Sequence, residues 1–301
     1  MLPAAAQEAA PPRPAVMAPL AVQGLLLDGA RAGDRLVVVG ERGHILVSDD
    51  AGGRWRQVAS PVQSTLTAVT FPDPQHGWAV GHDAAILHSA DGGEHWALQH
   101  WAPQRQQPLL DVWFRNAREG FAVGAYGLYL TTRDGGRSWV AASVRRGEEL
   151  HLNGIAALDD RTLFIAAEAG AVYRSRDGGA RWQRLTTPYA GSYFGALALP
   201  GRRLLIFGLR GKVFESRDLG ETWRALDSAT TASLMGGGAG DGGIALVGLG
   251  GTLLTQAAPQ APLRLTTLPA RTALAAPLFV NGRYLLLGER GVTAPPAGTR
   301  P

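Results

Sequence analysis

Short apolar runs separated by polar turns recur along most of the chain, and each run has the length of a β-strand. The run LTAVTF at residues 66–71 is followed by a turn with two prolines, and then by GWAVGH, AILHS and HWALQ. The β-branched and aromatic residues in these runs favour strands, and the apolar positions do not repeat with the period of a helix. We therefore predict four short strands between residues 66 and 99.

The same arrangement recurs at near-constant spacing. An apolar strand that ends in a small residue and a turn occurs seven times, with steps of 40 to 43 residues. These small residues are Gly40, Gly81, Gly124, Ala167, Gly208, Gly248 and Gly288. Four strands in about 40 residues are typical of a propeller blade. The sequence therefore predicts an all-β fold, a seven-bladed β-propeller with four-stranded antiparallel blades.

An octet of the form [S/T]-x-D-x-G-x-x-W follows the third strand of the first five units. Serine, threonine and aspartate oxygens can bond nearby backbone N–H groups, glycine adopts turn conformations, and tryptophan can pack between sheets. One aspartate per copy supplies too few oxygen ligands for calcium, so we interpret the octet as structural. Its key residues are Ser48, Asp50, Gly52, Trp55, Ser89, Asp91, Gly93, Trp96, Thr132, Asp134, Gly136, Trp139, Ser175, Asp177, Gly179, Trp182, Ser216, Asp218, Gly220 and Trp223.

The two ends of the chain suggest how the ring closes. The seventh unit lacks an outer strand after Gly291, while the apolar segment 15–23 precedes the first unit. We predict that this segment is an N-terminal strand that completes the last blade and removes a free sheet edge. The propeller would then span residues 15–301. Residues 1–14 have no periodicity and are interpreted as a disordered leader or the remnant of a signal peptide, because residues 4–6 fit a small-x-small cleavage pattern.

Composition and charge exclude several kinds of chemistry. The 301 residues contain no cysteine, which excludes disulfides, thiolate zinc sites and cysteine nucleophiles. The formal net charge is +4, and it comes from scattered arginines, with Lys212 as the only lysine. No basic block points to nucleic acid, and no apolar run is long enough to span a membrane. The histidines lack the spacing of a zinc helix. We therefore expect no metal, no cofactor and no nucleic-acid partner.

Two longer segments carry a resemblance to a known family. They are LTAVTFPDPQHGWAVGHDAAILHSADGGEHW and LLDVWFRNAREGFAVGAYGLYLTTRDGGRSW. They resemble the photosystem II stability/assembly factor family, and the likeness extends over residues 24–291. The octet itself is similar to the Asp-box, or bacterial neuraminidase repeat, which also occurs in sialidases. The resemblance to the assembly factors implies a non-catalytic seven-bladed propeller, exported to the periplasm or thylakoid lumen, that helps a membrane protein complex to assemble. We further expect a monomer.

In a propeller, the turns between second and third strands share one face with the links between blades, and this face is our candidate for partner binding. The predicted partner-binding residues are Arg42, His82, Arg105, Tyr126, Arg145, Arg146, Arg210 and Arg290. Arginine suits recognition of carboxylates because its guanidinium donates two parallel hydrogen bonds. The resemblance implies an arginine-rich patch for the partner.

The alternative is a sialidase- or glycosidase-like hydrolase. Such an enzyme needs a pair of carboxyl groups, for which Glu41, Asp83, Glu168 and Glu289 are available at turns of the same face. No Phe/Tyr-Arg-Ile-Pro stretch of the kind found in sialidases is present, and sialidases have six blades. We therefore favour the binding scaffold and predict no catalytic residues.

Overall fold

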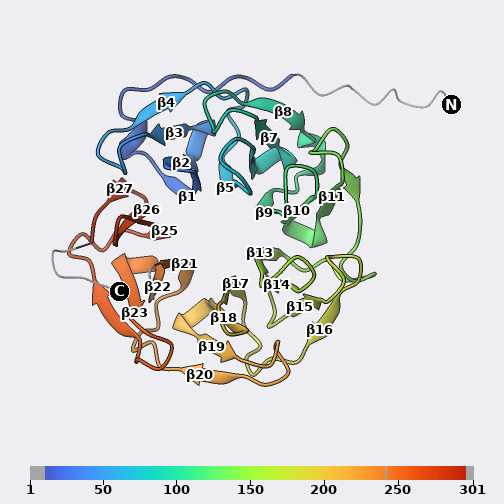
Figure 1. The fold of residues 1–301 in the computed structure, drawn as a ribbon, viewed down its shortest axis with the longest axis vertical. Helices are drawn as coiled ribbons and strands as arrows, with labels where there is room; N and C mark the ends of the chain where they lie inside the picture. The colour runs from blue at the N-terminus through green and yellow to red at the C-terminus, as the bar shows by residue number, and fades with distance from the viewer. Residues whose placement is uncertain (1–10, 241–242, 296–301) are drawn as a thin grey trace.

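The computed structural model describes residues 11–240 and 243–295, and these residues form seven antiparallel sheets arranged in a ring (Figure 1). Chain order runs from the inner to the outer strand within each sheet. This architecture confirms the predicted seven-bladed propeller. The second strands are buried at nearly every position, because both faces of each sheet pack against neighbouring blades, and this explains why they read as short continuous apolar runs.

The strands occupy equivalent positions in the blades. The innermost strands are β1 (Leu26–Ala32), β5 (Leu66–Thr70), β9 (Leu109–Phe114), β13 (Leu152–Ala157), β17 (Tyr193–Leu199), β21 (Leu234–Gly240) and β25 (Leu274–Val280). The second strands are β2 (Arg35–Gly40), β6 (Gly77–Gly81), β10 (Gly120–Gly124), β14 (Leu163–Ala167), β18 (Arg203–Gly208), β22 (Gly243–Gly248) and β26 (Arg283–Gly288). The third strands are β3 (Ile45–Ser48), β7 (Ile86–Ser89), β11 (Tyr129–Thr132), β15 (Val172–Ser175), β19 (Val213–Ser216), β23 (Thr252–Gln256) and β27 (Gly291–Thr293). The outer strands are β4 (Arg56–Val58), β8 (Ala97–His100), β12 (Val140–Ala141), β16 (Gln183–Leu185), β20 (Arg224–Leu226) and β24 (Arg264–Thr267).

Short 3-10 turns complete the secondary structure of the described residues. Five of them join the second and third strands of a blade, namely η2 (Glu41–Gly43), η3 (His82–Ala84), η5 (Ala125–Gly127), η6 (Leu209–Gly211) and η7 (Leu249–Gly251). Two others lie outside the blades, η1 (Ala21–Gln23) before β1 and η4 (Pro103–Arg105) between blades 2 and 3.

The serine or threonine and the aspartate of each octet form the same hydrogen-bonded turn, whereas the tryptophan bonds back to its octet glycine in blades 1 and 2. In the second blade the Ser89 hydroxyl donates to Asp91 Oδ1 at 2.9 Å and accepts from the backbone N–H of Gly93 at 2.8 Å. Asp91 Oδ1 in turn accepts the backbone N–H of His95 at 3.0 Å. The Trp96 indole N–H closes the turn by donating to the carbonyl of Gly93. These contacts explain why the serine, aspartate and glycine occur at fixed spacing.

The octets also connect neighbouring blades. The carbonyl of the fourth octet residue accepts a hydrogen bond from a side chain of the preceding blade, as in Gln99 Nε2 to Gly135 O at 2.8 Å. The same contact links Arg174 to Leu219 at 2.7 Å. The remaining donor–acceptor pairs are Arg35–Gly92, Arg115–Gly178 and Arg283–Ala51, with Arg217–Pro259 at the corresponding loop of blade 6. A local turn thus also fixes the spacing of the sheets around the ring.

The closure of the ring differs from the sequence prediction. Blade 7 has three strands within the described residues, and segment 15–23 contains η1 but no strand. The backbone N–H of Ala15 donates to the Ser60 carbonyl at 2.9 Å, and the N–H of Ala18 donates to Gln57 Oε1 at 2.8 Å. The segment therefore passes outside β4 of blade 1 (Figure 1). Pro19 has no N–H and would interrupt the ladder that a fourth strand requires.

Packing of η1, rather than a strand, seals the junction of the last and first blades. Ala21 is buried with Leu26 of β1 and Leu287 of β26 in one apolar cluster. The carbonyl of Val22 lies so close to Gly291 that a Cβ on this glycine would approach within 1.7 Å. Of the proposed leader 1–14, residues 1–10 lie outside the described residues.

Candidate protein-binding face

The turns after the second strands and the links between blades meet on one side of the ring, which we call the turn face. The N–H of Gly127 in η5 donates to Leu150 O at 2.9 Å, and the N–H of Ala102 donates to the Asp83 carbonyl at 2.8 Å. The octets lie on the opposite side, beside the turns that join first and second strands, as in the Gly92 N–H to Gln75 O bond. Octets and turn face are therefore separate surfaces.

The small residue before each turn is required by close backbone packing. A Cβ on Gly40 would lie 2.0 Å from the carbonyl of Leu25, and one on Gly81 would lie 2.0 Å from the carbonyl of Thr65. The centre of the turn is left-handed, with φ of 55° at Arg42 and 54° at Tyr126. This conformation raises the central side chain above the face and leaves it exposed.

All eight predicted partner-binding residues are exposed and belong to the turn face, but they do not form one cluster. Arg42, His82, Tyr126 and Arg210 lie in turns of blades 1, 2, 3 and 5, and Arg290 lies in the turn of blade 7. Arg105 belongs to η4, which packs beside η3, and Arg145 and Arg146 lie in the link between blades 3 and 4. The set is therefore distributed around the ring.

Carboxylates on this face are used to hold backbone. Glu41 Oε1 accepts the N–H of Leu25 at 3.1 Å, Glu168 Oε1 accepts that of His151 at 2.7 Å, and Glu289 Oε2 accepts that of Ala273 at 3.0 Å. Each of these glutamates caps the start of its own innermost strand. This role separates them into different blades, which does not favour the paired carboxyls of a glycosidase.

The arginines at the turn centres remain available to a partner. Within the described residues, no salt bridge joins Arg42, Arg210 or Arg290 to a carboxylate. Arg271, which the sequence reasoning missed, lies in the link after blade 6 with its Cα close to Gly251 of η7. Leu249 of the same turn is 45% exposed. Blades 5, 6, 7 and 1 thus each present an exposed arginine on this face, and Leu249 adds an exposed apolar side chain.

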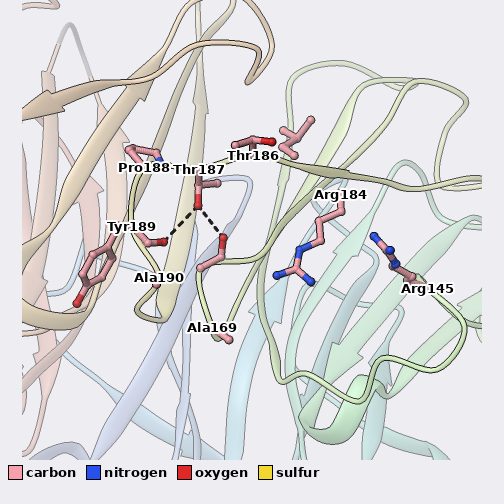
Figure 2. Close-up of a pocket in the computed structure, with 10 residues that line it drawn as sticks. Arg145, Ala169, Arg184, Thr186, Thr187, Pro188, Tyr189 and Ala190 are labelled. Atoms are coloured by element: carbon pink, nitrogen blue, oxygen red, sulfur yellow. Dashed lines mark hydrogen bonds between the residues drawn. The ribbon is translucent and has the colours of Figure 1, made fainter.

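A second cationic part of the face is an open cleft of about 580 Å³ beside blade 4. Figure 2 shows Arg145 and Arg184 on one side of it and the link Thr187–Ala190 on the other. The Thr187 hydroxyl donates to the carbonyl of Gly170 at 2.7 Å, which fixes this link against the neighbouring turn. Arg184 lies in the outer strand β16, and nothing in its sequence context marks it as a site residue.

Glu148 orders the two arginines of this cleft. Arg184 Nη1 donates to Glu148 Oε1 at 2.7 Å, Arg145 Nε lies 3.6 Å from the same oxygen, and the Tyr173 hydroxyl donates to Oε2. Partial burial acts to raise the pKa of Glu148, but the hydrogen bonds from Tyr173 and Arg184 outweigh it and lower this pKa. The carboxylate stays ionised and leaves several guanidinium N–H groups free to donate into the cleft.

Comparison with known proteins places the chain in a family. Residues 47–196 and 102–253 match the family model described as photosynthesis system II assembly factor YCF48, and together the two matches cover more than half of the chain. The chain belongs to this family. The matched region contains all five octets, so the residues that carried the resemblance are those that shape the blades.

Relatives within the family align over short segments. The photosystem II assembly protein Ycf48 of Synechococcus sp. (strain JA-3-3Ab) is 38% identical over 82 residues, which are 27% of this chain and 20% of that protein. The chloroplastic photosystem II stability/assembly factor HCF136 of Cyanidioschyzon merolae is 45% identical over 47 residues, 15% of this chain and 11% of the relative. The alignments therefore span a fifth or less of these relatives.

Solved structures share the fold of the whole ring. A YCF48 bound to D1 peptide has a TM-score of 0.74 at 17% identity, with 94% of this chain and 98% of that chain covered. A virginiamycin B lyase from Staphylococcus aureus has a TM-score of 0.77 at 10% identity, with coverages of 92% and 96%. Because an assembly factor and a lyase share this architecture, the fold alone does not give a function.

Proposed function

We propose that this protein binds a protein partner through the turn face and assists the assembly or stability of a membrane protein complex, as its family name suggests for photosystem II. The observation that carries the proposal is the combination of family membership with a face whose arginines are exposed while its glutamates cap strands. The partner surface would be acidic and the site non-catalytic.

Electrostatics support this choice of surface. Guanidinium groups donate bidentate hydrogen bonds to carboxylates, and a cationic face accelerates association with an acidic partner. The cleft beside blade 4 supplies Arg145 and Arg184 at one position, and Arg146 adds a third guanidinium from the same link. A carboxylate-rich peptide segment would fit this arrangement better than an apolar one.

The test is charge reversal on the two faces of the ring. We expect Arg145→Glu together with Arg146→Glu to weaken capture of solubilised photosystem II subunits, and of a synthetic D1 peptide, by at least tenfold. Arg137 and Arg202 are exposed on the octet face, so R137E with R202E changes the net charge equally and serves as the control. Equal losses in both double variants, or no loss in either, would argue against the proposed face.

Export and a monomeric state belong to the same proposal. A relative in Synechocystis is named a photosystem II assembly lipoprotein, and another is named chloroplastic. In the described part of the chain, no helix has the length and apolar character needed to cross a bilayer. Fractionation of the source cells and sedimentation of the purified protein test the two points.

A further inference from the structure

The innermost strands surround a channel with a volume of about 270 Å³ along the axis of the ring. Every one of these strands begins with a β-bulge, and the seven extra residues all line the channel. They are Leu27, Thr67, Leu110, Asn153, Phe194, Met235 and Ala275. The irregularity recurs at one level of the ring, so it re-aims the same position in each blade toward the axis.

Two carboxyl groups follow the bulges of blades 1 and 3 and reach across to the next blade. Asp28 Oδ2 accepts the backbone N–H of Val69 in β5 at 2.8 Å. Asp111 Oδ2 accepts the N–H of Ile155 in β13 at 2.7 Å. Blades 2 and 4 use uncharged side chains instead, with the Thr67 hydroxyl donating to Leu109 O at 2.8 Å and the Asn153 amide donating to Tyr193 O at 2.8 Å.

The channel supplies no counter-charge to these carboxyl groups. Among its described lining residues, which come from all seven innermost strands, Asp28 and Asp111 are the titratable groups, and no lysine, arginine or histidine is present. Both carboxyl groups are half-buried in the channel wall, and a carboxylate that is partly removed from water without a cationic partner is disfavoured in its charged form. A second carboxylate in the same channel adds repulsion.

We propose that the hydrogen bonds joining Asp28 and Asp111 to the next blades form a proton-sensitive pair of links, which we call the channel clasp. The channel clasp makes the inner ring more stable as the pH falls through the neutral range. Burial raises the pKa of Asp28 to about 7, although the hydrogen bond from the Val69 N–H acts to lower it. The charge of Asp111 adds to the rise. Burial likewise raises the pKa of Asp111 to about 6. Both values exceed the value of about 3.9 for an unfolded aspartate.

The sign of the effect follows from these directions. Between about pH 8 and pH 4 the folded ring binds more protons at these sites than the unfolded chain does, so its stability falls as the pH rises. Above the folded-state pKa values both carboxylates are charged and the contribution is lost. The contacts between blades at the channel are therefore weaker in alkaline conditions and stronger in mildly acidic ones. This effect does not depend on the cationic turn face.

Carboxyl titration in the wild-type protein tests the proposal directly. In carbon-detected NMR we expect midpoints between about pH 6 and 7 for Asp28 and Asp111, with the amide signals of Val69 and Ile155 changing over the same range. Midpoints below pH 5 for both groups would overturn the proposal. This measurement needs no variant and no partner, so it is separate from the test of partner binding.

Variants provide the second measurement. D28N keeps an oxygen that can accept the N–H of Val69 and removes the charge. At pH 8 we expect D28N to melt higher than wild type, by on the order of 5 °C, with the difference shrinking toward zero at pH 5. D111N also removes the charge, but its amide nitrogen replaces Oδ1, which accepts the N–H of Val112 at 2.7 Å, so for this variant we expect only the same change of the difference with pH. D160N removes an exposed charge from the turn between β13 and β14 and is the control. If the melting temperatures of the wild type, D28N and D111N change with pH in parallel, the proposed proton sensitivity is contradicted, even if all variants fold.

Discussion

The octet of blade 2 allows a quantitative test of what the repeated turn contributes. Asp91→Ala removes three hydrogen bonds at once, from the Ser89 hydroxyl at 2.9 Å, the His95 N–H at 3.0 Å and the His95 imidazole at 2.7 Å. The Asp91 side chain is 43% exposed, so each bond is placed at the low end of the usual range. At about 0.5 kcal/mol each, the unfolding free energy falls by about 1.5 kcal/mol.

Denaturant unfolding of the wild type and the variant checks this value. We expect a lower midpoint with an unchanged slope, because the exposed surface is the same. Although partial burial acts to raise it, hydrogen bonds from His95 and Ser89 lower the pKa of Asp91 to about 2. The stabilising effect is then present above about pH 4 and is lost as the pH falls toward 2, so the difference between the proteins must narrow there. If Asp91→Ala lowers the unfolding free energy by less than about 0.3 kcal/mol at pH 7, or if it abolishes partner binding, the structural interpretation of the octet is refuted.

Three further substitutions test the packing of the ring. Ala51→Gly should raise the unfolding free energy by about 0.5 kcal/mol in denaturant melts. Glycine relieves a left-handed φ of 59°, and this gain exceeds the cost of the greater conformational entropy of glycine in the unfolded chain. A lower unfolding free energy in the variant would show that Ala51 is not strained. Gly81→Ala should lower it by about 2 kcal/mol, because the new Cβ would lie 2.0 Å from Thr65 O, and an unchanged melting temperature would show that the backbone yields. Trp78→Ala should lower the unfolding free energy by about 3–5 kcal/mol, because this fully buried ring stacks on Phe114. A decrease under about 1 kcal/mol in urea titrations would mean that neighbouring side chains fill the cavity left by the ring.

Repetition made the fold predictable from one sequence. Seven small residues before seven turns fixed the number of blades, and the octets fixed the end of the third strand in five of them. The glycine run at 236–238 lies in β21, where a Cβ on Gly236 would come within 2.0 Å of Ala275 O in β25. Local patterns of this kind carry enough information for sheets built from neighbouring residues.

Contacts between blades were harder to predict because they join residues about 40 positions apart. The apolar character of segment 15–23 suggested a strand, but its hydrogen-bond partners Gln57 and Ser60 belong to blade 1 rather than blade 7. The channel carboxyls were missed although Leu-Leu-Asp opens the innermost strand in both unit 1 and unit 3, at Asp28 and Asp111. That shared tripeptide was a usable signal, whereas the approach of Arg184 to Arg145 left no trace in either local sequence.

Blade 6 indicates how much a single octet contributes to the ring. Gln256 stands where blades 1 to 5 have serine or threonine, and its amide donates to the carbonyl of Ala261 at 2.6 Å. Arg203 reaches across from blade 5 to donate to Gln256, and it also pairs with Glu215 at 2.5 Å inside blade 5. Burial acts to raise the pKa of Glu215, but hydrogen bonds from Arg224, Arg203 and Arg217 lower it to about 2.

The fourth-residue carbonyl of this loop still accepts a side chain from the preceding blade, although the aspartate and the tryptophan of the octet are absent. The side-chain hydrogen bond that joins neighbouring blades is therefore retained in blade 6, although the octet side chains that hold this turn in blades 1 to 5 are absent. Because one blade keeps its four strands without the octet, losing a single aspartate elsewhere must weaken the ring by a limited amount rather than unfold it. This is the physical reason for expecting about 1.5 kcal/mol, and not global unfolding, from Asp91→Ala.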